Sequence, residues 1–126
     1  MSIDSDISLL TNHQVRLIVK EVVKWCMDNM SNNGITPNVS VRNIRRKRSM
    51  LFGYYCPKTK TIVINRYFVW TLSKLIKVVI HEYTHHIQYL ANYGILLKKL
   101  GYEKHPAEIE ARHNEKYYID CHKSIF

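Results

Sequence analysis

Cysteine is scarce in this sequence, and its few copies are not arranged in pairs. The 3 cysteines are Cys26, Cys56 and Cys121, and no two of them form a C-x-x-C motif. An odd, sparse set of this kind argues against a small secreted scaffold held together by disulfides. We therefore expect free thiols in a reducing compartment, although one disulfide with one thiol left over is also compatible with the count.

Long hydrophobic runs and an N-terminal targeting signal are missing as well. No apolar stretch approaches the roughly 18 residues that a transmembrane helix needs. The first residues, MSIDSDISLL, carry Asp4 and Asp6 and lack the basic segment of a secretory signal. The expectation is a soluble cytoplasmic protein without a membrane partner.

Acidic residues are few compared with basic ones. The chain has 10 Asp and Glu against 19 Lys and Arg, a net charge of +9. Such a charge favours acidic partners but identifies none. The densest basic segment is VRNIRRKR, which contains Arg42, Arg45, Arg46, Lys47 and Arg48. This segment could bind the phosphates of a nucleic acid, but a solvated connection between strands is the simpler interpretation, because no aromatic residues alternate with the charges.

The length and the periodicity predict one α+β domain spanning residues 1–126. Thr11 or Asn12 can cap a first helix that reaches about residue 30. Alternating apolar residues predict strands that include Val39, Val41 and, less clearly, Ile44, followed by two strands at 50–56 and 61–65 joined by a hairpin turn at 57–60. Further helices are expected at about 71–92, 95–100 and 107–120.

The long predicted helix carries the motif HEYTH, from His81 to His85, inside an otherwise apolar run. Residues four apart lie on one face of a helix, so the two imidazoles can bind one zinc ion at roughly 2.0–2.1 Å. Glu82 lies beside that face, where its carboxylate can take a proton from a metal-bound water. The alternative is a helix whose histidines simply face the solvent.

A catalytic zinc site needs a third protein ligand, and the segment HPAEIEARHNE offers several. The candidates are His105, Glu108, Glu110 and His113. Glu108 is favoured because Ala107 and Ala111 flank it on one side of the last helix and would allow a close approach to the histidines. Glu110 points about 200° away from Glu108 on a regular helix, so both cannot be ligands. Glu108 could instead serve as a favourable acid at a helix N-terminus.

HEYTH followed by a glutamate on a later helix resembles the gluzincin metallopeptidases, most closely their minimal single-domain members and more loosely the ImmA/IrrE-type peptidases. The resemblance covers about residues 50–118. It implies a zincin-like fold with an active-site helix and a C-terminal ligand helix. It also implies one catalytic zinc ion (Zn²⁺) bound by His81, His85 and Glu108, with Glu82 as general base, and an edge strand near residues 53–56 that pairs with an extended peptide.

The sequence departs from this family at Arg112, where many members have an aspartate that orients a zinc-binding histidine. That orienting group must therefore come from elsewhere. His86 lies off the ligand pattern, and we expect it at the surface rather than beside the ligands. The donor that stabilises the oxyanion is left open among Tyr102, Arg112, His113, Tyr117 and Tyr118.

These observations favour a zinc-dependent endopeptidase with a restricted protein substrate. One alternative is a basic, zinc-stabilised domain that binds nucleic acid or acts as an adaptor. Glu82 argues against it, because a purely structural zinc site does not need such a carboxylate. Another is a regulatory peptidase that acts on DNA-bound proteins through both the zinc site and the basic segment.

Overall fold

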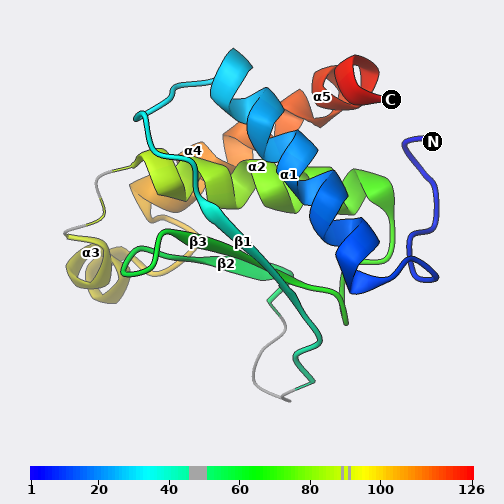
Figure 1. Cartoon of the computed structure of the whole chain (residues 1–126). Coiled ribbons are helices and arrows are strands. Elements are labelled where there is room, and N and C mark those ends of the chain that lie inside the picture. Colours follow the sequence, from blue (N-terminus) through cyan, green and yellow to red (C-terminus); the bar gives the residue numbers. More distant parts are fainter. Residues whose placement is uncertain (46–50, 89, 91) are drawn as a thin grey trace.

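The structure, a computed structural model, describes residues 1–45, 51–88, 90 and 92–126. Along the chain its elements are α1 (Asn12–Asn29), β1 (Asn38–Arg42), β2 (Gly53–Cys56), β3 (Thr61–Asn65), α2 (Leu72–Ile87), α3 (Tyr93–Leu100), α4 (Pro106–Asn114), the 3₁₀ turn η1 (Glu115–Tyr117) and α5 (Tyr118–Ile125) (Figure 1). The α+β class expected from the sequence is confirmed. In these ranges no helix is both long and apolar enough to cross a membrane.

The strands of the described residues form one mixed sheet in the order β1-β3-β2. β1 runs parallel to β3, and β2 runs antiparallel to it, so the predicted hairpin is confirmed and β2 is an edge strand. β1 ends at Arg42 and does not reach Ile44. Instead, the side-chain amide of Asn65 accepts a hydrogen bond from the N–H of Ile44 and donates one to its carbonyl, which continues the pairing without a strand.

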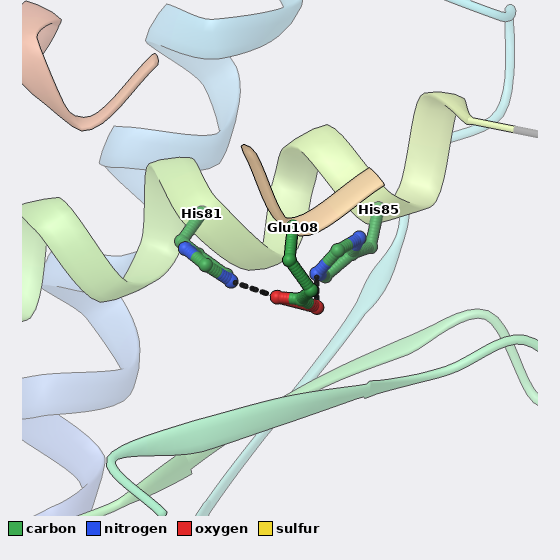
Figure 2. A group of neighbouring side chains, drawn as sticks. All are labelled: His81, His85 and Glu108. Atoms are coloured by element: carbon green, nitrogen blue, oxygen red, sulfur yellow. Dashed lines mark hydrogen bonds and ion pairs between the residues drawn. The ribbon is translucent and has the colours of Figure 1, made fainter. Parts of the chain in front are cut away.

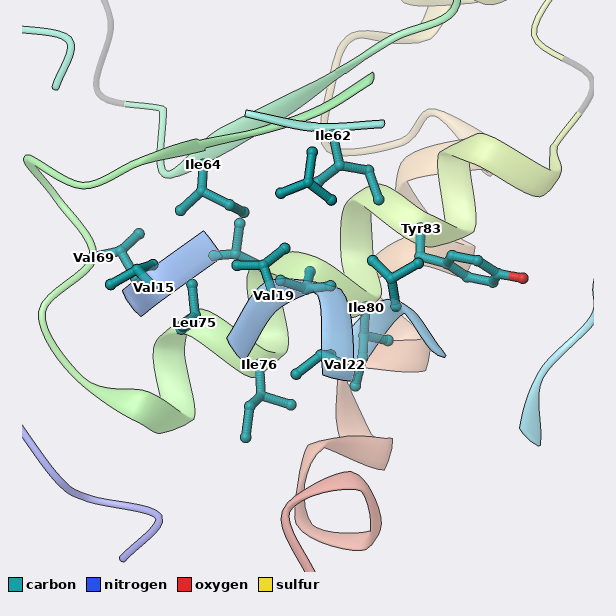
Figure 3. Packing of buried hydrophobic residues seen from close by; sticks show 14 of the residues in the cluster. Val15, Val19, Val22, Ile62, Ile64, Val69, Leu75, Ile76, Ile80 and Tyr83 are labelled. Carbon is teal, nitrogen blue, oxygen red and sulfur yellow. The ribbon is translucent and has the colours of Figure 1, made fainter. Parts of the chain in front are cut away.

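Helix α2 is the centre of the fold and contacts α1, α4, α5 and the strands β2 and β3. In Figure 1, α1 crosses α2, and the sheet lies beneath them. One face of α2 packs into a core of buried residues that includes Val15, Val19 and Val22 of α1, Ile62 and Ile64 of β3, and Leu75, Ile76, Ile80 and Tyr83 of α2 (Figure 3). Each fully buried aliphatic side chain of this kind contributes about 1.5–3 kcal/mol. The core therefore fixes the rotation of α2 and, with it, the direction of its polar face.

The predicted start of α2 is confirmed, but its predicted end is wrong. Thr71 caps the helix by accepting a hydrogen bond from the N–H of Lys74. The helix ends at Ile87 rather than near Asn92, because Gln88 adopts an extended conformation with ψ 154°. This conformation carries its side chain out to α4, where it forms hydrogen bonds with Ala107 and Glu110.

The last predicted helix, 107–120, is divided into α4, η1 and α5. A 3₁₀ turn advances about 120° per residue instead of the 100° of an α-helix. The side chains that follow Asn114 therefore change direction relative to α4. One of them, Glu115, reaches α2, where it contacts His81.

Candidate metal centre

Three predicted ligands meet between α2 and α4 (Figure 2). His81 and His85 lie one turn apart on α2, and Glu108 lies in the first turn of α4. Nε2 of His81 is 3.1 Å from Oε2 of Glu108, and Nε2 of His85 is 2.7 Å from Oε1 of the same carboxylate. The ligand atoms of the three residues all lie within 4.8 Å of one another, so this cluster can hold a metal ion.

The hydrogen bonds of the two imidazoles leave their Nε2 atoms for a metal. Nδ1 of His81 donates to Oε2 of Glu115 at 2.9 Å, and Nδ1 of His85 donates to Oε1 of Gln88 at 2.7 Å. In the neutral form that binds a metal, each imidazole would keep its single N–H at Nδ1, and Nε2 would present its lone pair to the ion. Nε2 of His85 is buried and forms no hydrogen bond within the described ranges, despite its short contact with Glu108. Either a proton or a metal ion can lie between each Nε2 and the carboxylate, and two imidazole nitrogens with one carboxylate are a donor set that fits a metal ion.

The two residues that orient the histidines, Glu115 and Gln88, were not predicted from the sequence. Glu115 supplies the carboxylate that Arg112 does not, and it lies seven residues after Glu108, a spacing that returns to the same helix face. Gln88 follows His85 by three residues, and its amide is oriented because its NH₂ group faces two acceptors, the carbonyl of Ala107 at 3.1 Å and Oε1 of Glu110 at 2.8 Å. In the sequence, only these spacings from the ligands could have indicated the two orienting residues, and many other polar residues have similar spacings.

We expect Glu115→Ala to raise the Kd for zinc about 10- to 100-fold, the effect typical of losing a partner that orients a metal ligand. Glu115→Gln should recover most of this loss, because an amide oxygen can still accept the Nδ1 hydrogen of His81. Competition with a calibrated chelator measures the Kd. Glu21→Ala, at an exposed position on α1, is the matched control. If Glu115→Ala bound zinc with an unchanged Kd, the proposal that Glu115 orients His81 would be contradicted.

The other candidate ligands lie elsewhere. His105 is buried at the N-terminus of α4, where Nδ1 accepts from the N–H of Ala107 and Nε2 donates to the carbonyl of Tyr93. Both of its nitrogens are thus engaged in hydrogen bonds with the backbone. Glu110 is exposed and bound to Gln88, and His113 is exposed beside Lys116.

The expected surface position of His86 is wrong. Only 5% of this residue is exposed. Nε2 lies 2.7 Å from the carbonyl of Ile35, an acceptor, so Nε2 carries the hydrogen and Nδ1 accepts from the hydroxyl of Tyr55 at 2.9 Å. His86 therefore ties α2 to the edge strand β2, and its nitrogens point away from the metal ligands.

The charges of the site shift the pKa values of its groups. Burial lowers the pKa of His81, but hydrogen bonds to Glu108 and Glu115 outweigh it and raise the pKa to about 9. Burial would raise the pKa of Glu108, yet the two imidazoles that contact its carboxylate hold this pKa well below its usual range. Burial raises the pKa of Glu82 to about 7, against the opposing effect of both histidines. A carboxyl group that titrates near neutrality suits a proton acceptor.

A groove runs between β2 and the polar face of α2. It consists of two adjoining clefts of about 410 and 310 Å³, and both are lined by Leu51, Gly53, His81, Glu82 and Tyr102. A Cβ atom at Gly53 would lie 2.5 Å from the carbonyl oxygen of Val63 and 3.0 Å from the side chain of Val78. Glycine is therefore needed for β2 to pass this close to α2.

Two tyrosines lie beside the metal ligands. The hydroxyl of Tyr93, on α3, donates to Oε1 of Glu108 at 3.0 Å, a contact that was not predicted from the sequence. Tyr102, which was considered, lines both clefts. Tyr117 and Tyr118 instead pack against the hydrophobic core. Tyr93 and Tyr102 therefore each place a hydroxyl-bearing side chain beside the candidate chemistry.

The basic segment is described only in part. The side chain of Arg42 contacts Ser40, and the guanidinium of Arg45 lies 5.6 Å from the centre of the Tyr67 ring. Arg46, Lys47 and Arg48 lie outside the described residues. Binding of nucleic acid through this segment stays a prediction.

Comparisons with protein-family models, with curated proteins and with solved structures find no match. Function must therefore be inferred from the site itself.

Proposed function

We propose that the protein is a zinc-dependent endopeptidase of the gluzincin type, with His81, His85 and Glu108 as zinc ligands and Glu82 as general base. The observation that supports this most strongly is the convergence of three ligand atoms beside a buried carboxylate that lines a groove. Two imidazoles and one carboxylate form a donor set typical of catalytic zinc, which keeps a further position for water or substrate. When bound, zinc supplies Lewis acidity, which activates water and polarises the scissile carbonyl.

Glu82 would move the proton during hydrolysis. It lines both clefts and is only 7% exposed, so its carboxylate meets substrate with little competition from bulk water. It would accept a proton as water oxygen bonds to the carbonyl carbon, and then deliver that proton to the leaving nitrogen as the C–N bond breaks. The carbonyl fragment leaves as a carboxylic acid and the other fragment as an amine, so atoms and protons balance. Tyr93 or Tyr102 could donate a hydrogen bond to the developing oxyanion.

The edge strand β2 would hold the substrate. β2 borders the groove through Gly53, Tyr54 and Tyr55, and no strand of the described residues pairs with its other edge. An extended peptide can add to such an edge through main-chain hydrogen bonds. This mode of binding favours unfolded or flexible segments as substrates. A groove with a carboxylate beside the metal ligands also disfavours the alternative of a closed, purely structural zinc site.

Zinc content and hydrolysis together test the proposal. Elemental analysis should find about one zinc ion per chain after reconstitution. A mixed library of quenched fluorescent peptides should then be cleaved, cleavage should stop when a chelator removes the metal, and added zinc should restore it. Zinc binding without cleavage of any peptide would overturn the peptidase, and failure to bind zinc would overturn the site as well.

Zinc binding should also release protons. Since the pKa of His81 is raised to about 9, its imidazole is protonated at neutral pH and must lose the Nε2 proton to bind a metal. The apparent affinity for zinc should therefore rise about tenfold per pH unit, for each proton released, between about pH 6 and pH 8. Calorimetric titration in two buffers with different ionisation enthalpies counts the protons. No release near pH 7 would contradict the assignment of His81.

A further inference from the structure

One end of the groove is cationic. The larger cleft is lined by Lys74 of α2 and Arg112 of α4, two positive side chains from different helices. Lys74 precedes His81 by seven residues, so it lies on the same face of α2, about 10 Å along the helix axis. An extended peptide covers this distance with about three residues. The cleft thus lies where a substrate side chain near the scissile bond would reach.

In the described residues, the two cations contact an aromatic ring and a backbone carbonyl, and Arg112 forms one long ion pair with Glu103. The ammonium of Lys74 lies 3.5 Å from the centre of the Phe52 ring, and burial lowers the pKa of Lys74. Arg112 donates one hydrogen bond to the carbonyl of Glu103, and its Nη1 is 4.0 Å from the carboxylate of that residue. In the described part of the chain, Nη1 is buried and forms no hydrogen bond. A buried donor of this kind is unfavourable until an acceptor reaches it, and an anionic acceptor suits it best.

Two carboxylates border the same cleft and offset part of this charge, and Glu115 attracts the ammonium of Lys74. Glu115 accepts the hydrogen bond from His81 that orients the ring. Glu82 lies at the metal end, beside both histidines. The opposite end of the groove is aromatic instead, and its described lining residues, which include Tyr54, Tyr55, Pro57, Leu90 and Tyr93, contain no Lys or Arg. The groove is therefore electrostatically asymmetric along its length.

We propose that the cleft between Lys74 and Arg112 binds a carboxylate of the substrate, so that peptides with this group about two or three residues from the scissile bond are cleaved preferentially. The carboxylate can belong to an Asp or Glu side chain or to a free C-terminus. This inference rests on the proposed peptidase function. The net charge of +9 supports it independently, because such a field attracts acidic segments to the protein.

The test uses zinc-loaded protein and pairs of quenched fluorescent peptides. In one series the two members of a pair differ by Glu or Gln at a single position, and this position is moved along the peptide. In the other series the two members differ by a C-terminal acid or a C-terminal amide. We expect kcat/KM to favour the carboxylate about tenfold or more at one position. Arg112→Gln and Lys74→Gln should each bring that ratio toward one without changing the zinc content. Arg112→Glu should reverse the preference toward Lys. Lys24→Gln, at an exposed position on α1, makes the same charge change outside the groove and should leave the ratio unchanged.

The outcomes separate this proposal from the peptidase function. Cleavage with ratios near one at every position and at the C-terminus would overturn the carboxylate cleft and leave the peptidase intact. If no peptide is cleaved, fluorescence anisotropy of the same peptides on zinc-loaded wild-type protein decides. The peptide with Glu or with a C-terminal acid should then bind more tightly than its Gln or amide counterpart, and Arg112→Gln and Lys74→Gln should each abolish this difference. Such a result would support the carboxylate cleft even though the proposed peptidase function had failed. Equal binding of all peptides would overturn both. A preference confined to the C-terminal acid would identify the free C-terminus as the source of the carboxylate.

Discussion

Glu82→Gln should lower kcat for peptide hydrolysis by about 10²- to 10⁴-fold while one zinc ion per chain stays bound. Glutamine keeps the size of the side chain, but its amide cannot accept a proton from water. None of the three ligand atoms changes, so the metal site stays intact. The substitution also removes a buried carboxyl group whose pKa is raised to about 7, so the fold should not be weakened by it.

Steady-state kinetics and elemental analysis on the same preparations make this test decisive. Glu110→Gln is the matched control, because Glu110 is an exposed carboxylate near the site that lies outside the ligand cluster. It should retain kcat within a few fold. Wild-type turnover in Glu82→Gln would exclude Glu82 as the general base. Loss of zinc in that variant would mean that Glu82 supports the metal rather than the proton transfer.

Glu108→Ala should raise the Kd for zinc by more than about 100-fold, beyond the range expected when only an orienting partner is lost. The substitution removes one of three ligands and also leaves the hydroxyl of Tyr93 without its acceptor. His81 and His85 alone give an incomplete site for zinc. Wild-type protein should unfold at a higher temperature when zinc is added, since a ligand that binds the folded state stabilises it, and Glu108→Ala should lose most of this increase.

Glu110→Ala is the informative comparison for the ligand assignment. In the described part of the chain, the carboxylate of Glu110 accepts a hydrogen bond from the amide of Gln88, which in turn orients His85. Its loss should therefore change the Kd for zinc by no more than about tenfold. Chelator competition and thermal unfolding, each with and without zinc, measure both variants. If Glu110→Ala lost zinc and Glu108→Ala kept it, the third ligand would have to be reassigned.

The two helices of the site serve different parts of the proposed chemistry. α2 supplies the two histidines and Glu82, and its other face is buried in the core, so these groups cannot rotate away from the groove. α4 supplies Glu108, and η1, which follows it, supplies Glu115. Local geometry within α2 therefore sets the spacing of two ligands. The docking of α4 onto α2 completes the site.

Local sequence determined the features that depend on neighbouring residues. The α1 cap at Thr11, the hairpin turn and the HEYTH motif on one helix face could all be predicted, because each depends on contacts within a few residues of the chain. The α+β class followed from the order of these elements. The zincin-like fold itself stays part of the proposal.

Only the tertiary structure decided which distant side chains meet. Glu108 was separated from three rivals because the docking of α4 turns this residue, and not Glu110, toward α2. The orienting role of Glu115 depends on the packing of η1 against α2, and the position of Tyr93 depends on where α3 lies beside the groove. The cationic cleft likewise joins Lys74 and Arg112, which are 38 positions apart (112 − 74). Sequence periodicity specifies the face on which a residue lies, whereas packing between elements determines which faces come together.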